Sequence, residues 1–103
     1  KLPEAKKYIL ACHEAANEAE GSPAAQAAAR AIGQAASSIH SAMHSLGLAL
    51  YGGVAIAYDQ LGMDAPWVKH EAFALKECEK ILAALQAVAV PDESNPVKVK
   101  WFC

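Results

Sequence analysis

The 103-residue sequence has little charge and few cysteines, and each shortage excludes a class of protein. The 9 basic and 11 acidic residues leave a net charge of −2 at pH 7. No basic surplus is present to bind a nucleic-acid backbone or an anionic membrane, and we expect neither partner. The three cysteines, Cys12, Cys78 and Cys103, are too few and too widely spaced for a disulfide framework. We expect reduced thiols, buried at Cys12 and Cys78, and a cytoplasmic protein.

We expect neither a secretory leader peptide nor a membrane-spanning apolar run in this sequence. Residues 1–20 mix apolar and charged side chains, which a secretory signal peptide does not do. No Asp, Glu, Lys or Arg occurs from Ala31 to Tyr58, but serine and histidine interrupt the first half of this stretch. Its purely apolar part, Leu46–Ala57, is shorter than the roughly 18–20 residues of a membrane span. We predict a buried central helix here.

Signatures of common catalytic sites are missing as well. The sequence contains no glycine-rich phosphate loop, no G-x-S-x-G motif and no C-x-x-C motif. The acidic residues fall on the expected solvent faces of helices, so no carboxylate pair is evident. The sequence leaves an enzyme open but favours a protein without catalytic activity.

Alanine, by contrast, is the commonest residue, and it has the highest helix propensity of all. Apolar residues recur at three- and four-residue steps, which is the period of one helix face. Pro3, Pro23 and Pro66 stand where helices begin, and Gly21 and Pro91 where they end. These signals predict an all-α fold in a single domain, residues 1–103. We expect a compact bundle of about four helices, at approximately 3–20, 23–39, 42–60 and 66–90, with an extended C-terminal tail.

Three of these helices show a stripe that we expect to face the core. On the second helix the stripe consists of small residues at four-residue steps, which let a neighbouring helix approach closely. The predicted stripes are Leu2, Ala5, Ile9, Cys12, Ala16 and Ala19 on the first helix, Ala25, Ala29, Gly33 and Ser37 on the second, and Val68, Leu75, Cys78, Leu82, Leu85 and Ala89 on the fourth.

The tail alternates apolar and basic residues and ends in aromatic ones. It predicts a short strand or an extended arm that docks on this core or on a second subunit. The aromatic tail, with more apolar helix surface than four short helices can cover, favours a homo-oligomer, a dimer. The alternating residues are Val97, Val99 and Trp101 against Lys98, Lys100 and Phe102.

Two histidines are the first candidates for a functional site. His40 and His44 are four residues apart, and on a continuous helix both would share one face. A zinc ion needs at least three protein ligands, and His13 on the first helix is a candidate for the third. The alternative is that His40 and His44 are hydrogen-bonded core residues that fix a bend near Ser37–Ser41, where Ser41 would cap the third helix.

Arg30 and Tyr51 are the remaining candidates. Arg30 is the only charged residue between Glu20 and Asp59, and it needs a partner or water. We expect a salt bridge to Glu14, Glu18 or Glu20 on the first helix, with anion binding as the alternative. We expect Tyr51 and Tyr58 to be core residues with hydrogen-bonded hydroxyl groups. His13, Arg30, His40, His44 and Tyr51 therefore form the predicted polar cluster, which is either ligand-binding or structural.

The middle of the chain carries a recurrent pattern. It consists of an A-R-A-x-G run, two histidines four residues apart, a glycine and an aromatic residue. These positions are Ala29–Gly33, His40, His44, Gly47 and Tyr51. With this pattern the chain resembles the bacterial immunity protein family of polymorphic toxin systems. The upstream segment Ala11–Ala16 also resembles the preceding helix of that family.

The resemblance implies an interaction protein that neutralises a toxin by direct binding. Family members carry valine and proline where this chain has Ser41-Ala42, which supports a helix break at this point. They also carry an additional N-terminal helical stretch, which we expect to be missing here. The alternative function is a small-ligand- or metal-binding helical bundle, or an enzyme, centred on His13, His40, His44 and Arg30. We expect no cofactor, with a zinc-type metal as the alternative.

Overall fold

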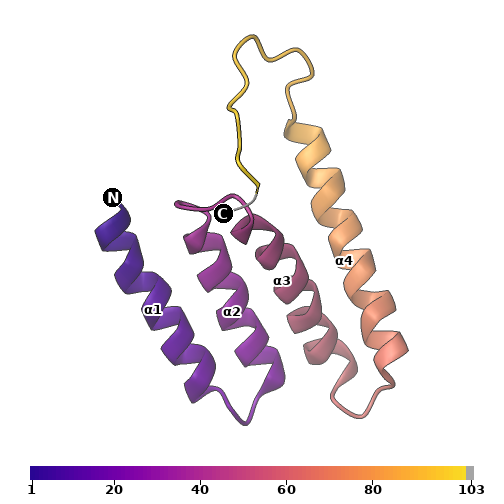
Figure 1. Cartoon of the computed structure of the whole chain (residues 1–103). Coiled ribbons are helices and arrows are strands. Elements are labelled where there is room, and N and C mark those ends of the chain that lie inside the picture. Colours follow the sequence, from indigo (N-terminus) through magenta and orange to yellow (C-terminus); the bar gives the residue numbers. More distant parts are fainter. Residues whose placement is uncertain (102–103) are drawn as a thin grey trace.

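The computed structural model describes residues 1–101 and contains four α-helices over that range (Figure 1). The helices are α1 Leu2–Glu18, α2 Pro23–Ser37, α3 His44–Leu61 and α4 Trp67–Val88. No strand occurs in this part of the chain. The all-α fold and the four predicted helices are confirmed, with ends that differ by a few residues.

Local sequence signals explain where most of these helices begin and end. Proline stands in the first turn of α1 and α2, and the Ser22 hydroxyl accepts a hydrogen bond from the Ala25 backbone N–H at 3.5 Å. Gly62 ends α3 with a φ of 69°, in the left-handed region that glycine tolerates. The expectation that Gly21 caps α1 in the same way is wrong, because Gly62 is the only residue up to position 101 with positive φ.

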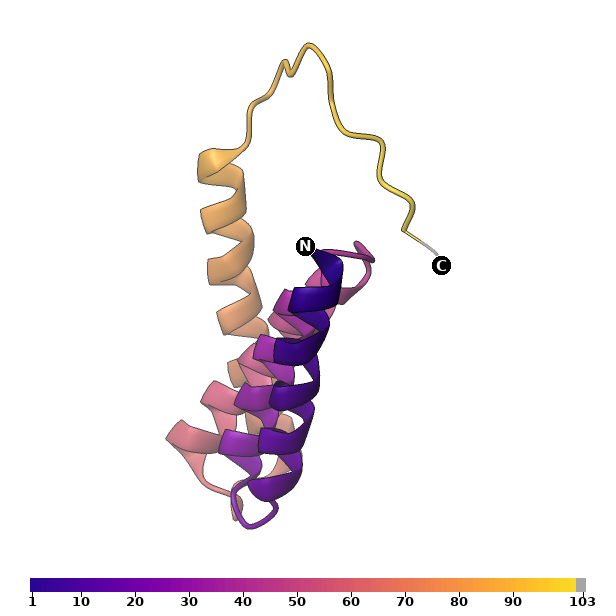
Figure 2. The same ribbon diagram turned by 90° about the vertical axis from the view of Figure 1, so that its left-hand side faces the viewer.

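The four helices lie side by side in chain order (Figures 1 and 2). Within residues 1–101, α1 packs on α2, α2 on α3 and α3 on α4, and no other pair of helices is in contact. The arrangement is therefore one layer of helices with two open faces. α3 is central in this layer, as the sequence predicts.

Small side chains form the contacts between the helices. A Cβ added at Gly33 of α2 would lie 3.2 Å from the Cys12 Cβ of α1. A Cβ at Gly53 of α3 would lie 3.0 Å from the Ala74 carbonyl oxygen of α4. The close approach that small residues predict is thus confirmed, although Gly33 faces α1. The buried apolar residues are Ile9, Ala16, Ala27, Ala31, Ala55 and Ala57.

The predicted core stripe of the fourth helix is mostly exposed, which corrects the expectation. Leu75, Leu82 and Leu85 are each more than half exposed, and Cys78 is half-buried. α3 is also less buried than predicted, since Leu50 and several other large side chains along it face solvent. Periodicity identifies an apolar face, but α4 has only α3 beside it in this structure.

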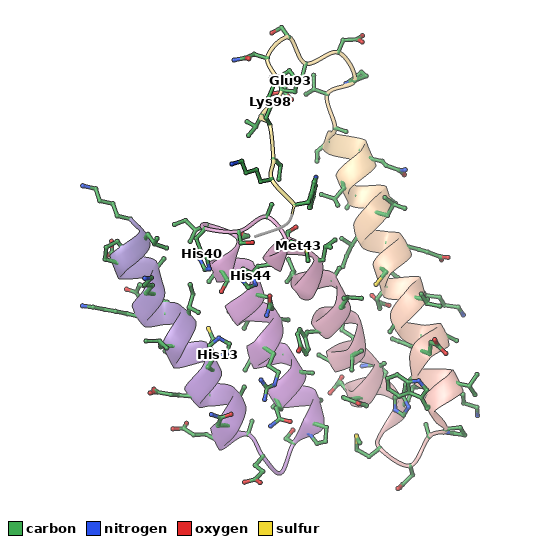
Figure 3. All side chains as sticks on the ribbon, in the orientation of Figure 1. His13, His40, Met43, His44, Glu93 and Lys98 are labelled. Carbon is green, nitrogen blue, oxygen red and sulfur yellow. The ribbon has the colours of Figure 1, made fainter. Side chains whose placement is uncertain are left out.

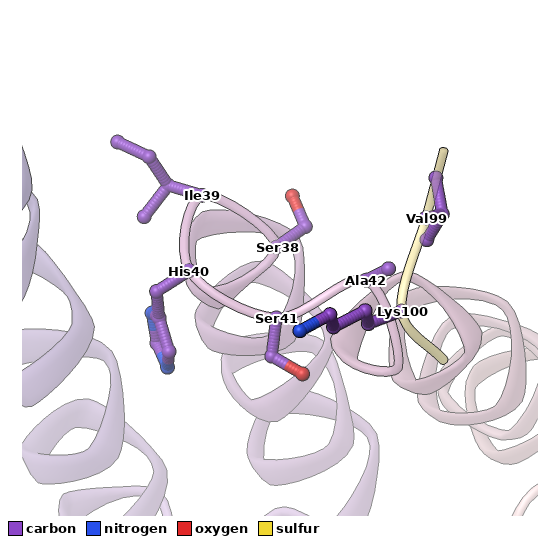
Figure 4. Close-up of a pocket in the computed structure, with 7 residues that line it drawn as sticks. All are labelled: Ser38, Ile39, His40, Ser41, Ala42, Val99 and Lys100. Atoms are coloured by element: carbon purple, nitrogen blue, oxygen red, sulfur yellow. The ribbon is translucent and has the colours of Figure 1, made fainter. Parts of the chain in front are cut away.

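The tail is an extended arm, one of the two predicted forms. After α4 it turns back and reaches the loop between α2 and α3, where Val99 and Lys100 line a groove of about 410 Å³ with residues 38–42 (Figure 4). The tail therefore returns to the chain's own α2–α3 loop, and Trp101 remains about half exposed. The predictions for Phe102 and Cys103 concern positions outside the described residues.

None of the helices in residues 1–101 has the length and hydropathy to cross a membrane. Cys12 and Cys78 are free thiols, as expected, and both are half-buried.

Candidate functional site

The bend between α2 and α3 is fixed by serine side chains that bond to the backbone. The Ser37 hydroxyl donates to the Gly33 carbonyl at 2.8 Å, and the Ser38 hydroxyl donates to the Ala35 carbonyl at 2.6 Å. Such bonds compete with the helix and favour its end at this point. α3 then begins at His44 with Met43 in the N-cap position, so the prediction of Ser41 as the cap is wrong.

His40 and His44 lie together at this bend, although no continuous helix joins them (Figure 3). Their ring centroids are 5.1 Å apart with the planes at 60°. His44 Nδ1 lies 2.7 Å from the Gln34 side-chain oxygen. Because an amide oxygen only accepts hydrogen bonds, Nδ1 of His44 is the donor. His44 therefore links the bend to α2, whereas His40 is exposed and is not the core residue that the structural interpretation expects.

Gly47 makes room for the Gln34 side chain. A Cβ at Gly47 would lie 2.6 Å from Cγ and Oε1 of Gln34. Gln34 and Gly47 are therefore positioning residues for His44, and sequence reasoning missed Gln34 altogether. The four-residue spacing from Arg30 to Gln34 was the available signal, since it places both on one side of α2.

His13 lies apart from this pair. It projects from the middle of α1, where its Cε1 is 4.0 Å from the position of a Cβ on Gly33 (Figure 3). Among the described residues, no three side chains of His, Cys, Asp or Glu gather closely enough to hold a metal ion. The structure does not bring the predicted third zinc ligand to His40 and His44.

Arg30 and Tyr51 lie in a groove of about 380 Å³ between α2 and α3, which we call the Arg30 groove. Arg30 is half-buried and has no ion-pair or hydrogen-bond partner in residues 1–101. The predicted salt bridge to Glu14, Glu18 or Glu20 is therefore wrong. Gly33 occupies the side of α2 that meets α1, whereas Arg30 points into the groove beside α3. The lining residues are Pro23, Gln26, Ala27, Arg30, Tyr51, Val54, Tyr58 and Met63.

The chain is similar to a known protein family. Residues 1–84 match the family described as Imm-5 like putative immunity protein. The chain belongs to this family. The resemblance carried by residues 29–51 is thereby confirmed, and the match includes all five residues of the predicted polar cluster. No curated protein and no solved structure matches the chain.

In this immunity-family chain, Tyr51 differs from its expected role. It is 40% exposed, and its hydroxyl has no hydrogen-bond partner within residues 1–101. Its ring lines the Arg30 groove. A core tyrosine was expected, but the open face of the layer leaves this side of α3 uncovered. Tyr51 is thus available for contact with another molecule.

Tyr58 and His70 have a structural role that the sequence did not reveal. His70 is buried, and its Nε2 donates to the Gly62 carbonyl at 2.7 Å. Its ring meets the Tyr58 ring edge to face at 5.2 Å and stacks on Trp67 at 6.2 Å. His70 therefore fixes the loop between α3 and α4. Only a three-dimensional contact reveals this, since eight residues separate His70 from Gly62.

A second groove of about 220 Å³ lies between α3 and α4. Leu50, Trp67 and Leu75 are among the residues that line it, and Val54 belongs to both this groove and the Arg30 groove. The two grooves therefore open on one face of the layer, on either side of α3. This face of the family member combines a polar half at Arg30 with an apolar half at α4.

Proposed function

We propose that this chain is an immunity protein that neutralises a toxin by binding it directly, and that the Arg30 groove is the toxin-binding surface. The membership of the chain in an immunity protein family supports the role. The groove supports the location, because it combines an arginine and two tyrosines, residue types that are enriched at protein interfaces.

The observation that carries the proposal is the unpaired Arg30. Arg30 is a half-buried residue that lines the groove between α2 and α3, and it has no acidic partner in the described chain. Removing a charge from water without a partner costs free energy. A carboxylate from a bound protein would restore the balance through two parallel hydrogen bonds, the geometry that arginine favours. We therefore infer that a toxin Asp or Glu pairs with Arg30.

The other residues of the groove are uncharged and would surround that carboxylate without repelling it. Arg30 is the only charged residue in residues 21–58, which supply most of the groove. Tyr51 and Tyr58 offer ring faces and hydroxyl groups, and Met63 offers an adaptable apolar contact. The net charge of −2 is too small to steer a partner over long distances. Recognition then depends on short-range contacts at the groove.

Coexpression with the toxin domain encoded beside this chain tests the proposal. The wild-type chain rescues growth and binds the purified toxin domain. Because removal of one partner from a buried charge pair costs about 2 kcal/mol or more, Arg30→Gln weakens binding at least about 30-fold. Lys76→Gln removes the same charge from an exposed position on α4 and leaves affinity unchanged. Equal binding by the wild type and Arg30→Gln would place the toxin elsewhere.

The second candidate function is small-ligand binding at the bend. The groove of about 410 Å³ favours it, because His40 and Lys100 line the groove with groups that can donate hydrogen bonds to an anion (Figure 4). Thermal unfolding in millimolar phosphate separates the two functions. An increase in Tm that His40→Ala abolishes would support the ligand, whereas the toxin-binding role predicts no such increase.

A further inference from the structure

α4 carries a row of large apolar side chains that the fold leaves open to solvent. Leu75, Leu82 and Leu85 are 59%, 55% and 60% exposed. Their spacing places them, with Cys78, on one side of the helix, and we call these four residues the leucine stripe. None of the four carries a charge. A soluble chain that exposes such a continuous apolar face uses it to contact another molecule.

The apolar face continues from α4 onto α3. Leu75 and Cys78 line the α3–α4 groove together with Leu50. Leu46 lies one turn before Leu50 on the same side of α3, and both of these leucines are more than half exposed. The uncovered face therefore spans two adjacent helices, which is wide enough for a helix to pack against.

The C-terminal half of α4 also lies beyond the other helices. Figures 1 and 2 show α4 extending past the start of α3, while the tail leads away from it before returning to the α2–α3 loop. Within residues 1–101, α3 is the only helix that α4 contacts. Val88 at its end is accordingly 76% exposed.

The chain exposes more solvent-accessible area than a folded monomer of its mass normally does. A folded monomer of 10.8 kDa exposes about 5,500 Å². This chain exposes 7708 Å², an excess of about 2,200 Å² over that estimate. The extended tail contributes part of the excess. Since an obligate homodimer buries about 1,000–2,500 Å² on each protomer, a second copy would cover an area of this size.

The small core indicates that the leucine stripe is covered by another molecule at all times. No large side chain in residues 1–101 is fully buried, and the helices meet mainly through alanine. Burial of apolar surface is the main favourable term in folding, and the largest apolar side chains contribute little of it here. The molecule that covers the leucine stripe must therefore be bound whenever the chain is folded. A second copy meets this condition, whereas a toxin is present only when it is encountered.

We propose that a second copy of this chain packs on the leucine stripe through its own leucine stripe and that the protein is a homodimer. The steps of three, four and three residues from Leu75 to Leu85 are those of the seam between paired helices. A two-fold axis places one patch against itself, and an uncharged stripe brings no like charges together. This dimer does not depend on the toxin-binding role.

Sedimentation equilibrium with two variants tests the proposal. The wild type at tens of micromolar has twice the chain mass of 10.8 kDa. Leu82→Lys places a charge in the stripe and increases the dimer dissociation constant at least about 100-fold. Ala83→Lys adds the same charge on another side of α4 and changes the constant by less than about threefold. A monomeric wild type, or a Leu82→Lys dimer as tight as the Ala83→Lys dimer, would overturn the proposal.

Crosslinking tests the same face if Leu82→Lys fails to fold. In a background with Cys12, Cys78 and Cys103 changed to Ala, a single cysteine replaces Leu82 or Ala83. A short bismaleimide joins the Leu82→Cys chains into dimers and leaves the Ala83→Cys chains mostly monomeric. Equal crosslinking of both variants overturns the proposed face. Protection of Leu82→Cys from maleimide labelling only when toxin is added assigns the stripe to the toxin and also overturns the dimer.

Discussion

The α1–α2 pair and the C-terminal half of α4 differ in what their apolar faces meet. At Gly33 of α2, a single added carbon would come within 3.2 Å of the Cys12 Cβ on α1. Leu82 and Leu85 of α4 are far larger, yet both are more than half exposed. The chain thus uses its smallest residues where its own helices meet and leaves its leucines on an open face. An apolar stripe here marks a surface for another molecule as readily as it marks a core.

Among substitutions that compare the two regions, we expect the largest loss of stability from a change at Gly33. Gly33→Leu forces a branched side chain into the α1–α2 contact, where an added Cβ alone would lie 3.2 Å from the Cys12 Cβ, closer than ordinary van der Waals contact. Overpacking of this kind lowers the free energy of unfolding by about 2–3 kcal/mol. Urea denaturation, at one fixed protein concentration because a dimer makes stability depend on concentration, measures the change.

Ala28→Leu is the matched control for this variant, because Ala28 is an exposed position on the same helix. It adds the same side chain without meeting α1, so we expect a change within about 0.5 kcal/mol. If both variants lowered stability equally, the α1–α2 contact would be looser than the structure shows, and the contrast with α4 would disappear.

The sequence predicts the helices well because their signals are local. Pro3, Pro23 and Pro66 mark the starts of three helices, and helical periodicity fills the segments between them. The bend with His40 and His44 is predictable for the same reason, since consecutive serines compete with helical hydrogen bonds there.

The site is predictable only in part, because its geometry depends on which side of a helix meets which neighbour. Arg30 was assigned a glutamate of α1, but the small side chain of Gly33 puts its own side of α2 against α1. Arg30 is left in the groove with Tyr51. Likewise, periodicity shows that Leu82 belongs to an apolar face but not whether the chain itself covers that face.

We expect a smaller effect on the free energy of unfolding at the α2–α3 contact, which lies between the two regions compared above. Gln34 accepts a hydrogen bond from His44 Nδ1 at 2.7 Å. A double-mutant cycle of Gln34→Ala and His44→Ala gives a coupling energy of about 1 kcal/mol, the usual net value of a partly buried hydrogen bond. Denaturant unfolding of the four proteins measures it.

His13→Ala is the control for this cycle, because His13 is an exposed histidine on α1 that lies away from His44 (Figure 3). It shows no coupling with Gln34→Ala. A coupling energy near zero for His44 itself would mean that the bend is held by the serine–backbone bonds alone, and that the histidine pair is free for a ligand.

We expect the smallest changes in stability at two neighbouring glycines of α3, where the same substitution to alanine has opposite effects. An added Cβ at Gly52 meets no atom within 4 Å, whereas one at Gly53 lies 3.0 Å from the Ala74 carbonyl oxygen. In a helix interior, Gly→Ala without a clash stabilises by about 0.5–1 kcal/mol, so Gly52→Ala raises the urea midpoint. Gly53→Ala lowers it, because the backbone of α4 must shift. A destabilised Gly52→Ala variant would show that the open side of α3 is covered in solution, and the contrast between packed and uncovered regions would then apply to α4 alone.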